Sequence, residues 1–266
     1  MVKYFFLIKI LKIYYKGENM TNTNIEKIKI SLENIGYIIN ECIEKENNGK
    51  FWQIKFKNSE KIVNIYNPNN KKNTYVNGKG NKDDKDRLKD IVDKIKCEEL
   101  EIDPLNLKIV QLINSKKEDY FYDFKMEFGG TDDSFLHDII CLSNNKENKE
   151  AYLIYGVDDN YNVVGIEKEI ISNNIYDFLK SKHFAGDHIP EIEIKHLFYK
   201  SKKIDVVVCK SSPNVPFFLT KLYQSIHEYQ IYTRVGDTNT AKNRHASYED
   251  VETLWKIHFD RKGENN

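Results

Sequence analysis

The sequence contains few cysteines, and none of them belongs to a paired motif. The four cysteines are scattered along the chain without a Cys-x-x-Cys pair: Cys42, Cys97, Cys141 and Cys209. This spacing argues against the usual zinc-binding motifs and against the disulfide framework of a secreted protein. We therefore expect free thiols and a cytoplasmic protein.

The chain also lacks an excess of charge of either sign. Lysine plus arginine and aspartate plus glutamate each number 41. No overall field attracts polyanions, so any nucleic acid must be held by local basic patches. The sequence has no Gly-x-x-x-x-Gly-Lys-Ser/Thr motif, which argues against a P-loop ATPase.

Long hydrophobic runs are missing as well. A membrane-spanning helix requires about 20 apolar residues, and Lys9 and Lys12 interrupt the apolar segment at residues 1–19. Its longest uncharged run, residues 4–8, is shorter than the core of a signal peptide. We therefore expect no membrane partner. Residues 1–19 are either an added amphipathic element or an upstream extension of a protein that starts at Met20, and we favour the extension.

Residues 20–98 have the pattern of a small α+β domain. Apolar residues recur at helical spacing from Asn24 to Glu41. Three strand-like runs and a charged amphipathic helix follow, at residues 49–56, 61–66, 73–78 and 82–97. The predicted order is helix, three antiparallel strands, helix, and residues 99–104 are predicted to be a linker.

The stretch TYVNGKGNKDDKDRL, residues 74–88, places a strand, a Gly-Lys turn and a helix in succession. Together with the strand order, it resembles the TATA-box-binding-protein-like (TBP-like) domain of ribonuclease HIII. The resemblance implies a curved sheet that faces nucleic acid. An interaction or dimerisation module is the alternative.

Residues 105–260 are predicted to form a second, mixed α/β domain with mostly antiparallel strands and flanking helices, and residues 261–266 a tail. Helices are expected at 105–115, from a cap at 132–134 through 144, at 173–181 and at 248–259. Hairpins are expected where AYLIYGV returns through NVVGI and where IEIKHLFY returns through KIDVVVCK. FFLTKL and YQIYTRVGDTN are expected to add short strands.

The stretch KEDYFYDFK, residues 117–125, suggests a site. Side chains two apart on a strand share a face, so Asp123 and Lys125 point the same way. A carboxylate can hold a divalent cation for phosphodiester hydrolysis, and a lysine beside it can orient water or stabilise developing charge. A surface ion pair between these two residues is the alternative.

Such a site needs further acids. Glu118 can join Asp123 only if the chain turns or bulges before the strand. Asp158 and Asp159 follow a strongly apolar strand, and the terminal acid completes a triad if that strand pairs beside the first. Ordinary turn chemistry at Asp158 and Asp159 is the alternative.

Three stretches carry a family resemblance, in this order: EDYFYDFKMEF, SFLHDIICLSNN and AYLIYGVDDNYNVVGI. With the later PNVPFFL and YQIYTRVGDTNTA, the region from about Leu105 to Phe259 resembles the Schlafen AlbA_2 domain. In nuclease members of that family, three acids bind a divalent metal and cleave transfer or ribosomal RNA. The resemblance implies four catalytic residues, the first three as ligands of Mg²⁺ or Mn²⁺: Glu118, Asp123, Asp159 and Lys125.

The chain departs from the family pattern at two places. Asp123 replaces the usual glutamate, which keeps the charge and shortens the reach by one methylene. The family's Gly-Gly before the second strand is replaced by NNKENKEA, residues 144–151. Because glycines there would let the backbone approach a ligand closely, their loss argues against a nucleotide cradle.

Candidate contacts to nucleic acid occur in both domains. Arg234 ends a strand beside Asp237 and Thr238 and is a candidate phosphate ligand; a structural Arg–Asp pair is the alternative. Basic and aromatic residues interleave in KHLFYKSKK, residues 195–203, for which a solvated strand and turn is the alternative. The predicted nucleic-acid-binding residues are Arg234, Lys195, Lys200, Lys202, Lys203 and Lys79.

These patterns predict a divalent-metal-dependent endoribonuclease that acts on structured RNA such as transfer RNA. A role in antiviral or toxin-type defence is implied by analogy only. RNA is the expected partner rather than DNA. The alternatives are a non-catalytic nucleic-acid-binding or nucleotide-responsive regulatory protein and a protein-interaction scaffold. The sequence leaves open whether the chain forms a homo-oligomer.

Overall fold

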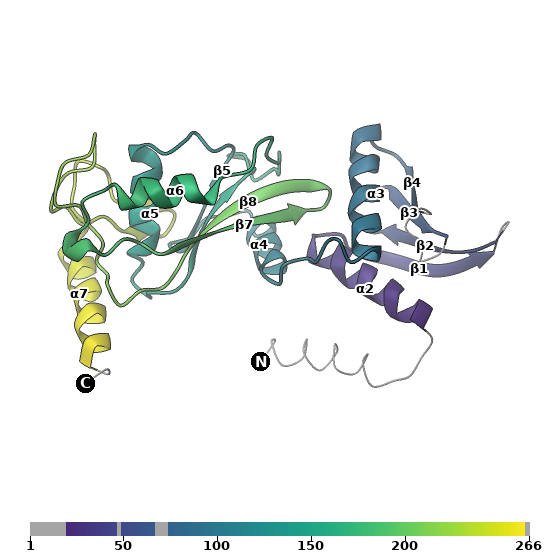
Figure 1. The fold of residues 1–266 in the computed structure, drawn as a ribbon, viewed down its shortest axis with the longest axis horizontal. Coiled ribbons are helices and arrows are strands. Elements are labelled where there is room, and N and C mark those ends of the chain that lie inside the picture. The colour runs from purple at the N-terminus through teal and green to yellow at the C-terminus, as the bar shows by residue number, and fades with distance from the viewer. Residues whose placement is uncertain (1–19, 47–48, 67–73, 264–266) are drawn as a thin grey trace. The chain divides into compact units, whose positions relative to one another are not determined.

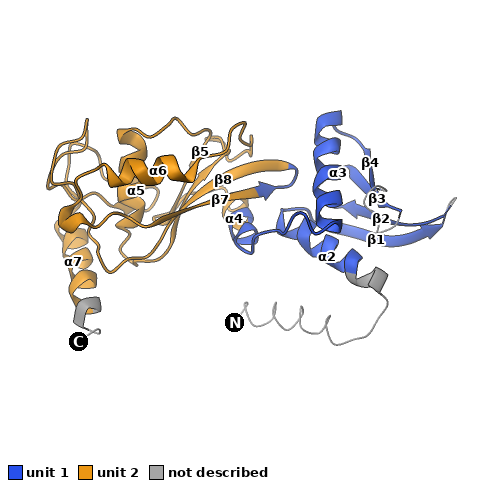
Figure 2. Ribbon diagram, viewed as in Figure 1, with its two compact units in different colours: residues 1–110, 198–201 blue, residues 111–197, 202–266 orange. Residues whose placement is uncertain are grey.

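The computed structural model describes residues 20–46, 49–66 and 74–263. The fold is mixed α+β, as the sequence predicts (Figure 1). The chain divides into two compact units, which are residues 1–110 with 198–201 and residues 111–197 with 202–266 (Figure 2). The described part of the chain has no helix whose length and apolar character would suit a membrane span.

Unit 1 is built from an antiparallel sheet with helices on one face. Its elements are α2 (Met20–Asn34), β1 (Ile39–Glu46), β2 (Lys50–Phe56), β3 (Lys61–Ile65), β4 (Thr74–Gly78) and α3 (Lys82–Lys96). The four strands follow the order β1-β2-β3-β4, so each pairs with its neighbour in sequence. Ile28 of α2, Ile54 of β2 and Val92 of α3 are buried in one shared core. The resemblance of this unit to TBP-like domains stays a prediction.

The predicted first helix is wrong at its C-terminal end, and unit 1 has four strands where three were expected. Helix α2 stops at Asn34, and Gly36 adopts a left-handed φ of 94°. The chain then enters β1, which pairs with β2. Ile38 and Ile39 continue the apolar spacing of the helix, so this spacing hides the break that Gly36 introduces.

Unit 2 contains a second four-stranded sheet, with the order β5-β6-β8-β7. Helix α4 (Leu105–Asn114) contains the boundary between the units. The other elements are β5 (Tyr122–Lys125), α5 (Asp133–Ser143), β6 (Ala151–Tyr155), α6 (Ser172–Lys180), the 3-10 helix η1 (Ala185–Asp187), β7 (Ile192–Tyr199), β8 (Lys202–Cys209), β9 (Arg234–Val235), β10 (Thr238–Asn239) and α7 (Tyr248–Gly263). Strand β5 is parallel to β6, and α5 provides the crossover between them.

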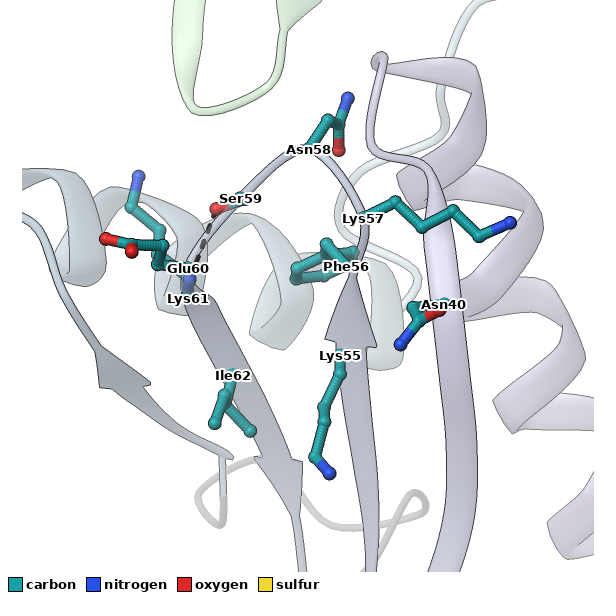
Figure 3. A pocket seen from close by; sticks show the side chains of 9 residues that line it. All are labelled: Asn40, Lys55, Phe56, Lys57, Asn58, Ser59, Glu60, Lys61 and Ile62. Carbon is teal, nitrogen blue, oxygen red and sulfur yellow. Dashed lines mark hydrogen bonds between the residues drawn. The ribbon is translucent and has the colours of Figure 1, made fainter.

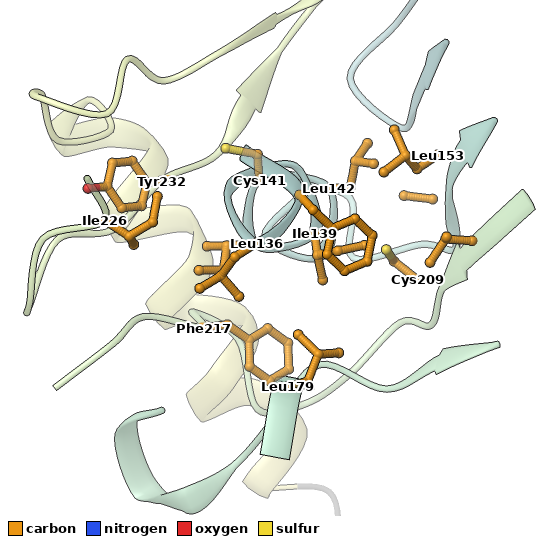
Figure 4. Packing of buried hydrophobic residues seen from close by; sticks show 14 of the residues in the cluster. Leu136, Ile139, Cys141, Leu142, Leu153, Leu179, Cys209, Phe217, Ile226 and Tyr232 are labelled. Carbon is orange, nitrogen blue, oxygen red and sulfur yellow. The ribbon is translucent and has the colours of Figure 1, made fainter. Parts of the chain in front are cut away.

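The core of unit 2 fixes helix α5 against the sheet. Leu136, Ile139 and Leu142 of α5 are fully buried, and they lie at the centre of the cluster shown in Figure 4. Leu153 of β6 belongs to the same cluster and pairs in register with Asp123 of β5. Because paired residues of neighbouring strands share a face, Asp123 lies on the helix-covered face of the sheet.

Several local predictions for unit 2 are confirmed. Asp132 caps α5 by accepting a hydrogen bond from Phe135 N at 2.9 Å. Strands β7 and β8 are neighbours in the sheet, as the predicted hairpin requires. The return through NVVGI is shorter than a full hairpin: the segments are joined by the antiparallel bridge between Val157 and Val163 and by backbone hydrogen bonds such as that from Val164 N to Gly156 O at 2.8 Å, and NVVGI forms no strand. FFLTKL forms no strand, and YQIYTRVGDTN contributes only the two-residue strands β9 and β10.

Asn144, at the end of α5, connects the helix to the segment that leads into β9. Its side chain is fully buried; Nδ2 donates to Phe217 O at 2.8 Å and to Tyr232 O at 2.9 Å, and Oδ1 accepts from Phe217 N at 2.7 Å. Its backbone oxygen accepts from Thr233 Oγ1 at 2.6 Å. These bonds position the residues that immediately precede Arg234.

Replacing Asn144 with alanine should destabilise the protein strongly. Asn144→Ala removes three side-chain hydrogen bonds and leaves a buried N–H and two buried carbonyls unpaired, so we expect a loss of about 3 kcal/mol or more in the free energy of unfolding. Urea unfolding followed by circular dichroism measures it. Asn160→Ala, at an exposed position, is the control and should change stability by less than about 0.5 kcal/mol. A similarly small effect at Asn144 would contradict this account.

Candidate functional site

The chain turns sharply just before strand β5. Asp119 and Tyr122 form an antiparallel bridge, in which Tyr122 N donates to Asp119 O at 3.2 Å. The turn folds Glu118 back along the strand, where its Oε1 accepts a hydrogen bond from Phe124 N at 3.1 Å. Glu118 therefore reaches the neighbourhood of Asp123 despite the odd spacing between them.

Arg234, on β9, joins these two acids. Its Nη2 donates to Glu118 Oε2 at 2.7 Å and to Asp123 Oδ1 at 3.1 Å. The rest of the guanidinium is held by Asp119 O, 3.0 Å from Nε, and by Asn239 Oδ1, 2.9 Å from Nη1. Only 2% of Arg234 and 4% of Asp123 are exposed. These are charge-assisted hydrogen bonds in buried surroundings, where such bonds are strongest.

Lys125 pairs with the second oxygen of Asp123. Its Nζ lies 2.8 Å from Asp123 Oδ2 and 3.6 Å from Asp138 Oδ2. The 2.8 Å contact is an ion pair without hydrogen-bond geometry, so Asp123 Oδ2 is buried and accepts no hydrogen bond. Asp138, on α5, accepts a hydrogen bond from Asn239 Nδ2 at 2.8 Å. We call these residues the acid cluster: Glu118, Asp123, Lys125, Asp138, Arg234 and Asn239.

The surroundings raise the pKa of two carboxyls in the acid cluster. Burial, followed by the charge of Asp123, raises the pKa of Glu118 to about 7. Burial also raises the pKa of Asp138 to about 6, helped by Asp123 and opposed by Lys125. Burial by itself lowers the pKa of Lys125, but the charges of Asp138 and Asp123 outweigh it, and the net pKa is raised. Three carboxyls face two cations, so the fully ionised cluster lacks one positive charge.

The structure does not bring Asp159 into the acid cluster. Asp159 is exposed in the turn after β6. Its neighbour Asp158 stabilises this turn by accepting hydrogen bonds from Asn160 N at 2.9 Å and Asn162 N at 2.7 Å. Among residues 20–46, 49–66 and 74–263, no three His, Cys, Asp or Glu side chains are arranged to hold a metal ion. The metal-binding role of the triad stays a prediction, and the structure unites only its first two members.

Arg234 has a different environment from the one expected of a phosphate ligand. Its guanidinium faces protein acceptors and is buried. It forms a structural Arg–Asp pair, as the alternative expects, and its acids are Asp123 and Glu118, while Asp237 accepts a hydrogen bond from Thr238 Oγ1 at 2.9 Å. In this conformation Arg234 binds other residues of its own domain and has a structural role.

The lysines of the predicted nucleic-acid patches all have protein partners. Three pair with glutamates and two donate to backbone oxygens: Lys195–Glu193 at 2.6 Å, Lys203–Glu169 at 2.6 Å, Lys79–Glu60 at 3.1 Å, Lys202–Val163 O at 2.7 Å and Lys200–Asn58 O at 3.2 Å. Surface ion pairs contribute at most about 1 kcal/mol, so a phosphate can replace them. The role of these lysines in binding stays a prediction.

Two members of the acid cluster, Asp138 and Asn239, are not among the residues predicted from the sequence. Asp138 does carry a signal, since it is an acid within the apolar helix sequence SFLHDIICL. A carboxyl in such a setting needs a cationic or hydrogen-bonding partner. Asn239 carries no local signal, because its position beside Asp138 depends on the path of the β9–β10 hairpin.

Unit 1 contains a hollow of about 620 Å³ at the turn between β2 and β3 (Figure 3). Its lining residues are Asn40, Lys55, Phe56, Lys57, Asn58, Ser59, Glu60, Lys61 and Ile62. No member of the acid cluster is among them. The hollow is therefore separate from the acidic chemistry of unit 2, and the cluster is the stronger candidate site.

Residues 118–243 match the family model described as Schlafen, AlbA_2. This range contains the whole acid cluster, from Glu118 to Asn239. Residues 118–243 therefore belong to the Schlafen AlbA_2 family, which indicates a function connected with nucleic acids. No curated protein and no solved structure gives a significant match to the chain.

The raised pKa of Asp138 predicts a specific pH dependence of stability. The unfolded aspartate has a pKa of about 3.9, so between this value and about 6 the folded protein holds a proton that the unfolded chain releases. The stabilisation is complete below the unfolded pKa and is lost as the pH rises through the folded one, by up to about 3 kcal/mol.

Asp138→Asn should remove this contribution. We expect the free energy of unfolding of the variant to fall less steeply than that of the wild type between about pH 4 and pH 7. Urea unfolding across this range measures both slopes. Asp237→Asn, at an exposed position, is the control and should keep the wild-type slope. Equal slopes for Asp138→Asn and the wild type would disprove the assignment.

Proposed function

We propose that the AlbA_2 domain is a divalent-metal-dependent endoribonuclease that acts on structured RNA such as transfer RNA. The observation that carries the proposal is the convergence of two carboxylates on one cationic atom. Glu118 and Asp123 lie 2.7 and 3.1 Å from Arg234 Nη2. The family supports nucleic acid as the substrate class, while RNA and a role in defence come from the resemblance to its nuclease members.

The donor set fits a divalent cation. Mg²⁺ and Mn²⁺ prefer carboxylate oxygens, and a Mg²⁺ site commonly uses one or two protein carboxylates together with substrate phosphates. Asp123 Oδ2 is a buried oxygen that contacts the ammonium of Lys125 at 2.8 Å and accepts no hydrogen bond of good geometry. Glu118 and Asp123 would hold the metal, and Asp159 is the proposed third ligand. The fit requires that the guanidinium of Arg234 leave the position between the two acids and that the turn carrying Asp159 move toward them.

The residues around the two acids suit phosphodiester hydrolysis. A bound divalent cation supplies Lewis-acid stabilisation of the phosphate and lowers the pKa of water. Lys125 shares a strand face with Asp123, and 39% of its side chain is exposed. The side chain is thus partly exposed, and its ammonium would stabilise the charge that develops on the phosphate during cleavage.

A second candidate function is nucleic-acid binding without cleavage. It is favoured by the contacts of Arg234, which already supplies a cation to both Glu118 and Asp123 in the described conformation. In this case the acid cluster is a structural centre of the domain, and RNA is held by surface lysines. The two candidates differ in what the acids do, so substitution of the acids separates them.

Cleavage of total RNA by the purified full-length protein, with Mg²⁺ or Mn²⁺, tests the proposal. We expect the wild type to cleave and Asp123→Asn to reduce the rate at least about 100-fold, because one of the two converging carboxylates can no longer bind a cation. Asp159→Asn tests the proposed third ligand and should have a comparable effect. Glu228→Gln, an exposed acid outside the cluster, should cleave like the wild type.

Two outcomes would contradict the proposed nuclease. A wild type that cleaves with neither metal, and whose salt-sensitive RNA binding survives Asp123→Asn, supports the second candidate. Cleavage at the wild-type rate by both Asp123→Asn and Asp159→Asn would remove the proposed site.

A further inference from the structure

Arg234 Nη2 lies between the two acids, Glu118 and Asp123, that would hold the metal of the proposed function. One oxygen of each acid points to this nitrogen, at 2.7 Å and 3.1 Å. A divalent metal binds carboxylate oxygens at about 2.0–2.6 Å. The nitrogen and a metal cannot both lie between the same two oxygens, so occupancy of this position by one excludes the other.

The charge of the acid cluster favours an exchange of one cation for the other. With Arg234 in place, three carboxyls face two single positive charges, from Arg234 and Lys125. A divalent cation in place of the guanidinium would balance the three carboxylates together with Lys125. The cluster thus attracts a dication more strongly than its present cation on charge alone.

The hydrogen bonds of Arg234 oppose this exchange. The guanidinium makes four hydrogen bonds within the domain, two of them to Asp119 O and Asn239 Oδ1, which are not among the proposed metal ligands. Arg234 is also almost completely buried. A metal that enters must break these contacts or move the guanidinium away from the two acids, which lowers its apparent affinity.

We propose that Arg234 is an internal cation that competes with a divalent metal for Glu118 and Asp123, and thereby sets the metal affinity of the site. This inference rests on the metal site of the proposed function. The acid cluster would then have two mutually exclusive states, which differ in the cation that lies between Glu118 and Asp123. In one state the guanidinium of Arg234 lies between the two acids, and in the other state the metal does.

Mn²⁺ binding, followed by electron paramagnetic resonance and calorimetry, tests the competition directly. Arg234→Gln keeps an amide donor and removes the charge, so we expect its affinity for Mn²⁺ to exceed that of the wild type by about tenfold or more. Without metal its Tm should fall, since the buried Asp123 and the partly buried Glu118 lose their cation. Added Mn²⁺ should raise the Tm of this variant more than that of the wild type.

Two further variants complete the experiment. Arg244→Gln, at an exposed position, is the matched control and should bind Mn²⁺ like the wild type. Arg234→Lys keeps one positive charge but lacks the guanidinium fork, so we expect its Mn²⁺ affinity to lie between the wild type and Arg234→Gln. Adding Asp123→Asn to Arg234→Gln should abolish the gain in affinity.

Equal Mn²⁺ affinity of the wild type, Arg234→Lys and Arg234→Gln would overturn the inference. If Arg234→Gln folds only with Mn²⁺, the inference is supported; if it does not fold with Mn²⁺ either, the comparison of Arg234→Lys with the wild type decides. Failure of the proposed function is distinguishable. Tightened Mn²⁺ binding without RNA cleavage by any variant leaves the competition intact and removes only the nuclease. RNA cleavage by the wild type, together with equal Mn²⁺ affinity of the wild type and the Arg234 variants, supports the nuclease and removes the competition.

Discussion

Two carboxylates buried side by side repel each other unless a cation lies between them. In this domain Arg234 supplies that cation, with one nitrogen bonded to both Glu118 and Asp123. Other parts of unit 2 hold these three residues in position. The turn at Asp119 brings Glu118 back to the strand, and Asn144 fixes the backbone that precedes Arg234. The interaction therefore ties the first strand of the domain to its last hairpin.

The acid cluster can be read in two ways from the same contacts. With Arg234 in place, it is a largely buried centre of the domain, in which burial, followed among the raising causes by the charge of Asp123, raises the pKa of Glu118 and of Asp138. With a divalent metal in place, the same acids would face a substrate phosphate. The family connects this domain with nucleic acids, and the cluster is the site to which we assign the proposed cleavage.

The parts of the fold that the sequence predicts well have local causes. The cap of α5 at Asp132 and the neighbouring strands β7 and β8 follow from residues close together in sequence. Predictions failed where a local pattern was overridden. Apolar spacing ran past Gly36, whose positive φ ends the helical segment, and an apolar run at 162–166 reads as a strand although only one bridge forms there. The candidate site was half predicted, because Asp123 and Lys125 share a strand face and Glu118 follows from the family spacing.

What the sequence determined by itself is the family, the charged face of β5 and the turn that Glu118 requires. All three depend on residues within a few positions of each other or on an ordered set of motifs. Only the tertiary structure decided which groups meet those acids. Arg234 lies 111 residues from Asp123, and Asn239 lies 101 residues from Asp138. No local periodicity relates such distant residues, since their contact depends on how the β9–β10 hairpin packs against β5 and α5.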